Sequence, residues 1–189
     1  MSDGLGERSD GDLAALSLTG EQAAFSALVR RHKEPLHRLV ARLIGDDDEA
    51  LDLVQEAFVS AHRALGSYDP ARPMRAWLSR IAINKARDWH RRRAVRRLIS
   101  AVLPMSATDH TADETPSAET VAIARQELAG VAAAIAALPS GLRETLVLRT
   151  IEGLSQAEVA QTLGVSEKTV ETRLYRARLK LEKRVGPNG

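Results

Sequence analysis

Apolar residues recur at three- and four-residue spacing along most of the chain, which predicts α-helices and no strand-rich core. In the first half, the spacing predicts a helix beginning after Thr19, where 19–22 (TGEQ) resembles an N-terminal cap. Pro35 is expected to kink or divide this helix. A second helix is expected from about 49 to 65, after an acidic turn.

The stretch 74–97 has the clearest two-sided pattern in the chain. At about 100° per residue, its apolar side chains share one half of a helix, and three arginines and an amide share a narrow arc on the opposite edge. The apolar half comprises Trp77, Leu78, Ile81, Ala82, Ala86 and Trp89, and the polar arc comprises Arg80, Asn84, Arg87 and Arg91. One face is therefore expected in the core, with both tryptophans. The other suits phosphates and base edges, although taken alone it is equally typical of a solvated face.

A proline-containing loop, 66–73, precedes this basic stretch and brings Tyr68 to its start. Two prolines stiffen the loop, so it is expected to lose less entropy on capturing a ligand than a Gly-Ser loop would.

The second half of the chain predicts a helix-turn-helix unit. Helices are expected from about 118 to 137 and from 142 to 152, the latter ended by Gly153. A capping box at 155–158 (SQAE) starts a short helix, and Gly164 supplies the turn before a final helix capped by Ser166. On that last helix, an apolar arc belongs to the core, namely Val170, Leu174, Ala177 and Leu181. A separate polar arc is expected to face a major groove, namely Thr169, Thr172, Arg173, Arg176 and Lys180.

Charge divides the 189 residues into unequal segments. The net charge is −3 over 1–18, +6 over 19–99, −4 over 100–120 and +3 over 121–189. Two basic bodies separated by an acidic segment predict two nucleic-acid contacts. We therefore expect an all-α chain with a disordered tail (1–18), a first helical domain (19–98), a flexible acidic linker (99–118) and a second helical domain (119–185).

Composition and motifs narrow the function classes. The chain has no cysteine, so neither a disulfide framework nor a thiolate metal site is expected, which suits a cytoplasmic protein. Neither a secretion signal nor an eighteen-residue apolar run is seen, so no membrane insertion is expected. Paired carboxylates, HExxH, a P-loop and a Ser/His/Asp arrangement are all missing, and the five histidines are scattered, so we expect no enzyme, metal or cofactor. The alternative to the interpretation below is a helix-turn-helix regulator working alone, but such a protein has no need of the basic helix 74–97.

Taken in order, a series of blocks is similar to the bacterial RNA polymerase sigma factors of the extracytoplasmic-function (ECF) group, over roughly 21–97 and 119–184. In the first domain, the blocks are 52–58 (DLVQEAF), 77–82 (WLSRIA), Asn84, Asp88 and 91–93 (RRR). In the second, they are 138–139 (LP), 142–144 (LRE), 147–149 (VLR), 152–155 (EGLS), 158–160 (EVA), 163–165 (LGV) and 169–178 (TVETRLYRAR).

This resemblance implies sigma region 2 in the first domain, sigma region 4 in the second, and a protein that directs core RNA polymerase to promoters and helps to open the DNA. It implies contact with the clamp helices of the largest polymerase subunit through Asp52, Gln55, Glu56 and Phe58. It implies binding of the −10 element by Tyr68, Asp69, Arg72, Arg80, Asn84, Arg87, Asp88 and Arg91. It implies binding of the −35 element by Ser166, Lys168, Thr169, Thr172, Arg173, Arg176 and Lys180.

The resemblance also implies further partners. These are the polymerase flap, and an anti-sigma factor that could hold the otherwise cytoplasmic chain at the membrane. The loop 66–73 resembles the segment that captures a flipped −10 base, but Pro73-Met74 stands where an aromatic residue often precedes Arg-x-Trp, so the base preference is left open. Because a loop beside bulky arginines suits a strand lying across it, we expect the −10 element to be read as single-stranded DNA.

Overall fold

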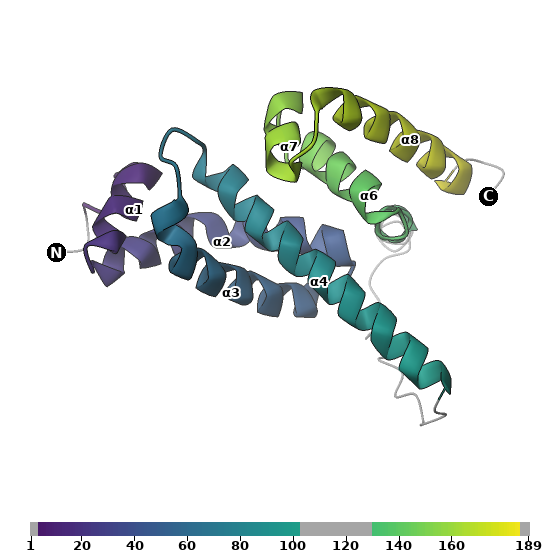
Figure 1. The fold of residues 1–189 in the computed structure, drawn as a ribbon, viewed down its shortest axis with the longest axis horizontal. Helices are drawn as coiled ribbons and strands as arrows, with labels where there is room; N and C mark the ends of the chain where they lie inside the picture. The colour runs from purple at the N-terminus through teal and green to yellow at the C-terminus, as the bar shows by residue number, and fades with distance from the viewer. Residues whose placement is uncertain (1–3, 103–129, 186–189) are drawn as a thin grey trace, which may run out of the picture.

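A computed structural model of the chain describes residues 4–102 and 130–185, and every regular element in these residues is helical. The first domain contains α1 (Asp10–Leu18), α2 (Gln22–Ile44), α3 (Asp47–Ala64), the short η1 (Leu65–Ser67) and α4 (Met74–Val102). The second contains α6 (Ser140–Leu146), the π-helical turn η2 (Val147–Ile151), α7 (Gln156–Leu163) and α8 (Glu167–Val185). Figure 1 shows the two groups of helices stacked side by side. The expected all-α, two-domain fold is confirmed.

The core of the first domain lies where α2, α3 and α4 pack together. Leu39, Val54 and Ile83 each expose 1% of their surface there. Trp89 is also buried, and its indole Nε1 donates to Glu49 Oε2 at 3.0 Å, so the polar atom of this large side chain has a partner. The expectation for Trp89 is thus confirmed. Trp77 lies instead at the edge of the core, partly exposed and packed against Tyr68.

The beginning of the chain differs from the expectation of a disordered tail, because residues 10–18 form helix α1. The Ser9 side chain caps this helix by accepting from the backbone N–H of Asp12 at 3.1 Å. Leu13 and Ala14 are buried against the rest of the domain. The expected cap at the start of α2 is not formed by Thr19. This residue instead ends α1, and its hydroxyl donates to the carbonyl of Leu16 at 2.8 Å.

Three expected boundaries also change. The first long helix continues through Pro35 as one element, so it is not divided there. Helix α4 runs on to Val102, which makes the first residues of the expected linker helical. The rest of that linker, and the beginning of the helix expected from about 118, lie outside the described residues.

The helix-turn-helix part of the second domain is built as the sequence predicts. Ser155 and Glu158 form the reciprocal capping box at the start of α7. Gly164 then takes a left-handed conformation, with a φ of 67°, which gives the turn into α8 without the strain that a side chain would add. Val170 and Ala177 of α8 are fully buried. The single helix expected over 142–152 is instead α6 followed by η2.

The burial of α1 can be tested by shortening one of its side chains. Leu13 exposes 0% of its surface and Leu18 exposes 59%, so the same substitution should have different effects at the two positions. Leu13→Ala should lower the free energy of unfolding by about 2–5 kcal/mol, because it leaves a cavity. Leu18→Ala should change it by less than about 0.5 kcal/mol. Both tryptophans lie in the first domain, so urea unfolding followed by tryptophan fluorescence measures the relevant transition. Equal values for the two variants would show that α1 is not part of the core.

Candidate nucleic-acid interface

The polar edge of α4 carries the largest group of residues expected to contact nucleic acid. Arg80, Asn84 and Arg91 are exposed along it. The Asn84 Oδ1 atom accepts a long hydrogen bond from Arg87 at 3.4 Å, and Arg91 pairs with Asp88 at 3.0 Å. These contacts are short in range and open to solvent, so they hold the cations in a row without neutralising the surface.

The loop between η1 and α4 is held by bonds between its own residues. The Tyr68 hydroxyl donates to the Arg72 carbonyl at 2.8 Å, and its ring lies 5.4 Å from the ring of Trp77. Asp69 accepts from the backbone N–H of Ala71 at 3.0 Å and pairs with Arg72 at 3.2 Å. Burial, and then the negative charges of Asp10 and Asp69, raise the pKa of Tyr68. Tyr68 therefore braces the loop from inside and is not an open stacking surface.

The polar arc of α8 is only partly exposed. Ser166, Lys168, Arg176 and Lys180 are exposed, whereas Thr169, Thr172 and Arg173 are half-buried. Ser166 accepts from the backbone N–H of Thr169 at 3.2 Å, and Thr172 donates to the carbonyl of Lys168 at 2.9 Å. The Arg173 guanidinium packs over Gly141, so close that a β-carbon added to this glycine would lie 3.3 Å from Arg173 Cζ. The exposed cations are thus the most accessible part of this arc.

Two acids of the second domain bind arginines of the first. Glu144, which exposes 3% of its surface, accepts from Arg87 Nε at 2.8 Å and from Arg87 Nη2 at 2.6 Å. Glu152 accepts from Arg75 at 2.5 Å and lies 3.3 Å from Arg42. The hydrogen bonds that Arg87 donates to Glu144 raise the pKa of Arg87. One member of the cationic row on α4 is thus occupied by the second domain, whose helix α7 also contacts α4.

Sequence reasoning did not find these cross-domain pairs. Glu144 and Glu152 look like ordinary helix acids, and no local pattern indicates a partner more than fifty residues away. A third contact joins Arg143 to His90, with Nη2 2.7 Å from Nε2. An arginine can only donate, whereas the same Nε2 also lies 3.0 Å from the Leu43 carbonyl, which can only accept, so the two contacts compete for this nitrogen. Burial, helped by the charge of Arg143, lowers the pKa of His90, which favours the neutral ring and the contact with Arg143.

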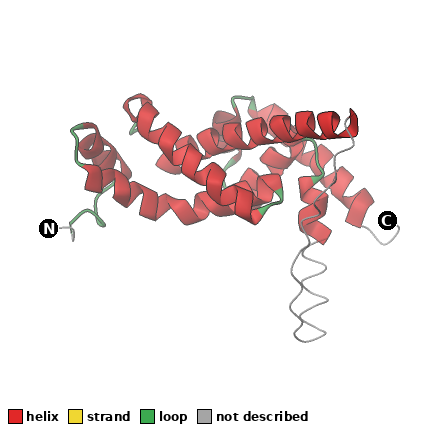
Figure 2. Cartoon of the chain, turned by 90° about the horizontal axis from the view of Figure 1, so that it is seen from below, coloured by secondary structure: helices red, strands yellow, loops and turns green. Residues whose placement is uncertain are grey.

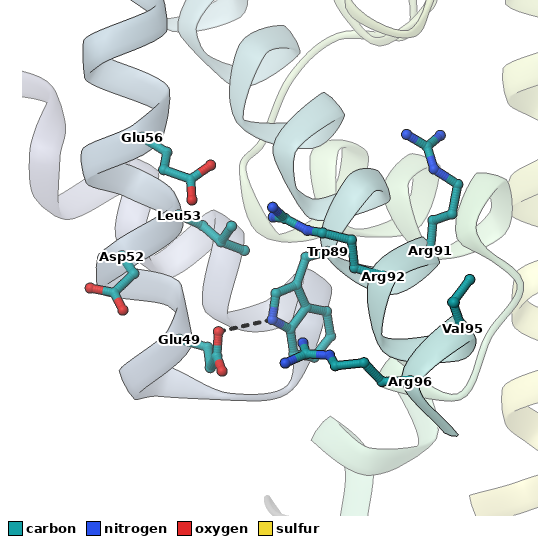
Figure 3. Close-up of a pocket in the computed structure, with 9 residues that line it drawn as sticks. All are labelled: Glu49, Asp52, Leu53, Glu56, Trp89, Arg91, Arg92, Val95 and Arg96. Atoms are coloured by element: carbon teal, nitrogen blue, oxygen red, sulfur yellow. Dashed lines mark hydrogen bonds between the residues drawn. The ribbon is translucent and has the colours of Figure 1, made fainter. Parts of the chain in front are cut away.

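A groove of about 670 Å³ separates α3 from the second half of α4. Figure 3 shows the acids and Leu53 on the α3 side and the arginines and Val95 on the α4 side, with the Trp89 ring directed from α4 towards Glu49. The acids are Glu49, Asp52 and Glu56, and the arginines are Arg91, Arg92 and Arg96. Gln55 lies beside it, in a neighbouring hollow with Val59 and Lys85. Phe58 exposes only 7% of its surface and belongs to the core, so its expected role as a contact residue is corrected to a packing role.

Within residues 4–102 and 130–185, no group of three or more His, Cys, Asp or Glu side chains could hold a metal ion. Among the same residues, no helix combines the length and apolar character needed to cross a bilayer.

Comparison with known proteins matches each domain separately. Residues 28–96 match the family model for Sigma-70 region 2, and residues 128–181 match that for Sigma-70, region 4. The chain is 43% identical over 179 residues to the RNA polymerase sigma factor CnrH of Cupriavidus metallidurans, covering 93% of both chains. It is 37% identical over 180 residues to the ECF RNA polymerase sigma factor SigM of Mycobacterium tuberculosis, covering 95% of this chain and 86% of that one.

A solved structure of CnrH in complex with the cytosolic domain of CnrY is similar with a TM-score of 0.70 and 37% identity, covering 95% of this chain and 99% of that one. Figure 2, which turns the molecule by 90°, shows that the described residues of both domains form helices and loops. With both sigma regions present in order, and full-length relatives above 30% identity, the chain belongs to the ECF group of RNA polymerase sigma factors.

Proposed function

We propose that this transcription initiation factor uses three separate surfaces to bring core RNA polymerase to promoters. The groove between α3 and α4 binds the polymerase, the row of cations on α4 with the adjoining loop reads the −10 element, and the polar arc of α8 reads the −35 element. The observation that carries the proposal is the placement of two cationic faces on two different domains, with a mixed-charge groove between α3 and α4 that adjoins the first of them at Arg91. A helix-turn-helix regulator acting alone would need only α8.

The groove suits a helical partner that carries both signs of charge. Asp52, Gln55 and Glu56 are exposed along α3, opposite the arginines of α4. The floor is apolar, so it can bury aliphatic side chains, while the rims fix their register through charge. The resemblance of the α3 block 52–58 to the sigma-factor segment that contacts the polymerase clamp helices supports assigning the groove to core polymerase.

The −10 surface fits a single strand better than a duplex. Arg80 and Arg91 are exposed on one edge of α4, and the loop leads directly into the start of the same helix (Figure 1). A strand lying across the row can pair its phosphates with Arg80 and Arg91 and offer base edges to Asn84. Extruding a base costs a few kcal/mol, so promoter opening draws on binding energy supplied by the polymerase.

For Arg87 to join this row, the two domains have to separate. Its guanidinium is bound on two nitrogens by Glu144, and Arg72, Trp77 and Arg80 share a small hollow with Gln161 of α7. The closed arrangement thus covers part of the −10 surface. Because both acids regain water when the domains part, the pairs hold the arrangement weakly, and polymerase binding to both domains can open it.

An anti-sigma factor fits the same arrangement. The similar CnrH structure contains the cytosolic domain of CnrY, and this chain shares 37% identity with that sigma factor. We infer that a comparable partner binds this chain in the cytoplasm and keeps its polymerase and promoter surfaces occupied. The same partner, if membrane-anchored, would hold the chain at the membrane.

Core binding is tested by changing the α3 rim. Gln55→Ala combined with Glu56→Lys should abolish competition for core polymerase and promoter-specific run-off transcription, because it removes an amide and reverses a charge at the groove. The matched control makes the same two changes at exposed positions of the α2 start, Gln22→Ala with Glu21→Lys. Core affinity should fall by at least about tenfold in the first variant, equal to 1.4 kcal/mol. If both variants bind core alike, the groove is not the polymerase site.

Domain separation is tested by removing one acid at a time. Glu144→Gln and Glu152→Gln each break a cross-domain ion pair, but only the first releases Arg87. Both should increase the distance between the domains in solution scattering, whereas only Glu144→Gln should strengthen binding of the free chain to a single-stranded −10 oligonucleotide. We expect a gain of a few-fold, since a charge contact to a phosphate adds about 1 kcal/mol or less at an exposed site. Equal oligonucleotide binding by both variants would mean that Arg87 takes no part.

Promoter reading by α8 is tested at Arg173. Arg173→Ala should cost about 1–3 kcal/mol and relax the preference at one −35 position if the side chain makes a bidentate base contact. Arg178→Ala is the matched control, because Arg178 is exposed and lies on the face of the same helix opposite to Thr169. Run-off transcription from a set of −35 variants separates the two outcomes. A uniform loss on every variant would mean that Arg173 contacts only phosphate.

A further inference from the structure

Helix α1 lies directly beside the start of the loop proposed to read the −10 element. Figure 1 shows α1, in purple, next to η1, from which the loop leads to α4, and the two elements are in contact. Neither the family model for region 2, which begins at residue 28, nor the sequence motifs include this helix. Its position therefore raises the question of what it contributes to promoter reading.

Helix α1 is fixed to the domain at three points. Leu13 is completely buried, and Ser9 caps the first turn. Asp10 pairs with Arg31 of α2 at 2.6 Å and lies 3.0 Å from His32. Arg31 also donates to the carbonyls of Gly6 and Arg8, at 2.8 and 2.9 Å. A helix held in this way can act as a rigid wall for whatever lies against its other side.

The loop lies against that other side. A β-carbon placed on Gly11 would be 3.4 Å from the Cβ of Pro70, and one placed on Gly66 would be 4.0 Å from Leu18 Cδ2. Asp10 also acts on the loop through its charge, which contributes to the raised pKa of Tyr68. The loop is thus touched by α1 both where it begins and near its middle.

The loop has few other external supports. Apart from Tyr68, residues 66–73 are all exposed, and the hydrogen bonds and ion pairs recorded for Tyr68, Asp69 and Arg72 join loop residues to one another. Such bonds keep the shape of the loop, and the Tyr68 ring packed against Trp77 ties its first part to α4, whereas the exposed part around Pro70 has its contact with α1. Recognition of a base depends on position to within about an ångström, because misplaced groups lose their hydrogen bonds.

We propose that α1 is a specificity element, in which the bare Gly11 position sets where Pro70 and the −10-reading loop lie. This inference rests on the proposed function of that loop. An alanine methyl would just touch Pro70 at ordinary contact distance, whereas a longer side chain would have to push the loop away.

The test lengthens this side chain. Gly11→Met should shift or weaken the preference among −10 variants by about tenfold, equivalent to 1.4 kcal/mol, while core affinity and −35 preference stay unchanged. Gly11→Ala should behave like the wild type. Ala15→Met is the matched control, because it adds a methionine at an exposed position of the same helix. Run-off transcription from promoters that differ only in the −10 element measures the preference.

A double-mutant cycle tests whether the effect of Gly11→Met passes through Pro70, and it does not depend on a single variant. Pro70→Gly removes the side chain that Gly11→Met would meet, so the combined variant should show no further change in −10 preference beyond that of Pro70→Gly alone. Additive effects, or a Gly11→Met profile equal to that of Ala15→Met, would overturn the inference. If Gly11→Met does not fold, tolerance of the methionine in the Pro70→Gly background supports the contact, and renewed unfolding there overturns it. Failure of the proposed function would look different, because the wild type itself would then show no −10 preference.

Discussion

The arrangement of this sigma factor depends on one helix, α4, that has to satisfy two environments along its length. Ile83 and Trp89 are buried on one side, while Arg80 and Asn84 are exposed on the other. Because a helix is rigid, the burial of the first pair fixes the direction of the second. The Trp89 indole adds a directional bond to Glu49 of α3, so the rotation of α4 about its own axis is set by a hydrogen bond as well as by packing. The direction of the cationic row on α4 is therefore well defined, although its side chains are exposed to solvent.

The same helix explains why the contact between the domains can be both specific and weak. Glu144 is almost fully buried, whereas Arg87 is partly open to water. The charge-assisted bonds offset the loss of water around Glu144 only while the geometry is kept, so a small displacement makes solvation more favourable than pairing. Glu152 behaves in the same way towards Arg75 and Arg42. Contacts of this kind select one closed arrangement without making it permanent, which suits a protein whose domains have to grip separate promoter elements.

How much the sequence could predict depended on the range of the interactions involved. The capping box of α7, the Gly164 turn and, apart from Trp77, the buried side of α4 were predicted correctly, because each depends on residues a few positions apart. Helix α1 was missed because a short, polar, Gly-containing segment has the composition of a disordered tail. What holds it is an ion pair between Asp10 and Arg31, twenty-one residues apart. Ser9, which caps the start of α1, and the apolar Leu13 after it are the local signals for this helix. Thr19 ends α1, but its sequence context also resembles the start of a helix.

The −10 loop shows the same limit at the level of function. Two prolines and a tyrosine suggested a stiff loop that offers an aromatic surface, yet the stiffness comes largely from Tyr68 itself, whose hydroxyl and ring are engaged with Arg72 and Trp77. A side chain used in this way cannot also swing out to stack on a base without releasing the loop. If the loop captures a base as we propose, the groups free to do so are its exposed backbone and Asp69 and Arg72, whose ion pair can open at little cost. Preorganisation by Tyr68 lowers the entropy lost on binding, and the wall provided by α1 keeps that preorganised shape in register with the arginines of α4.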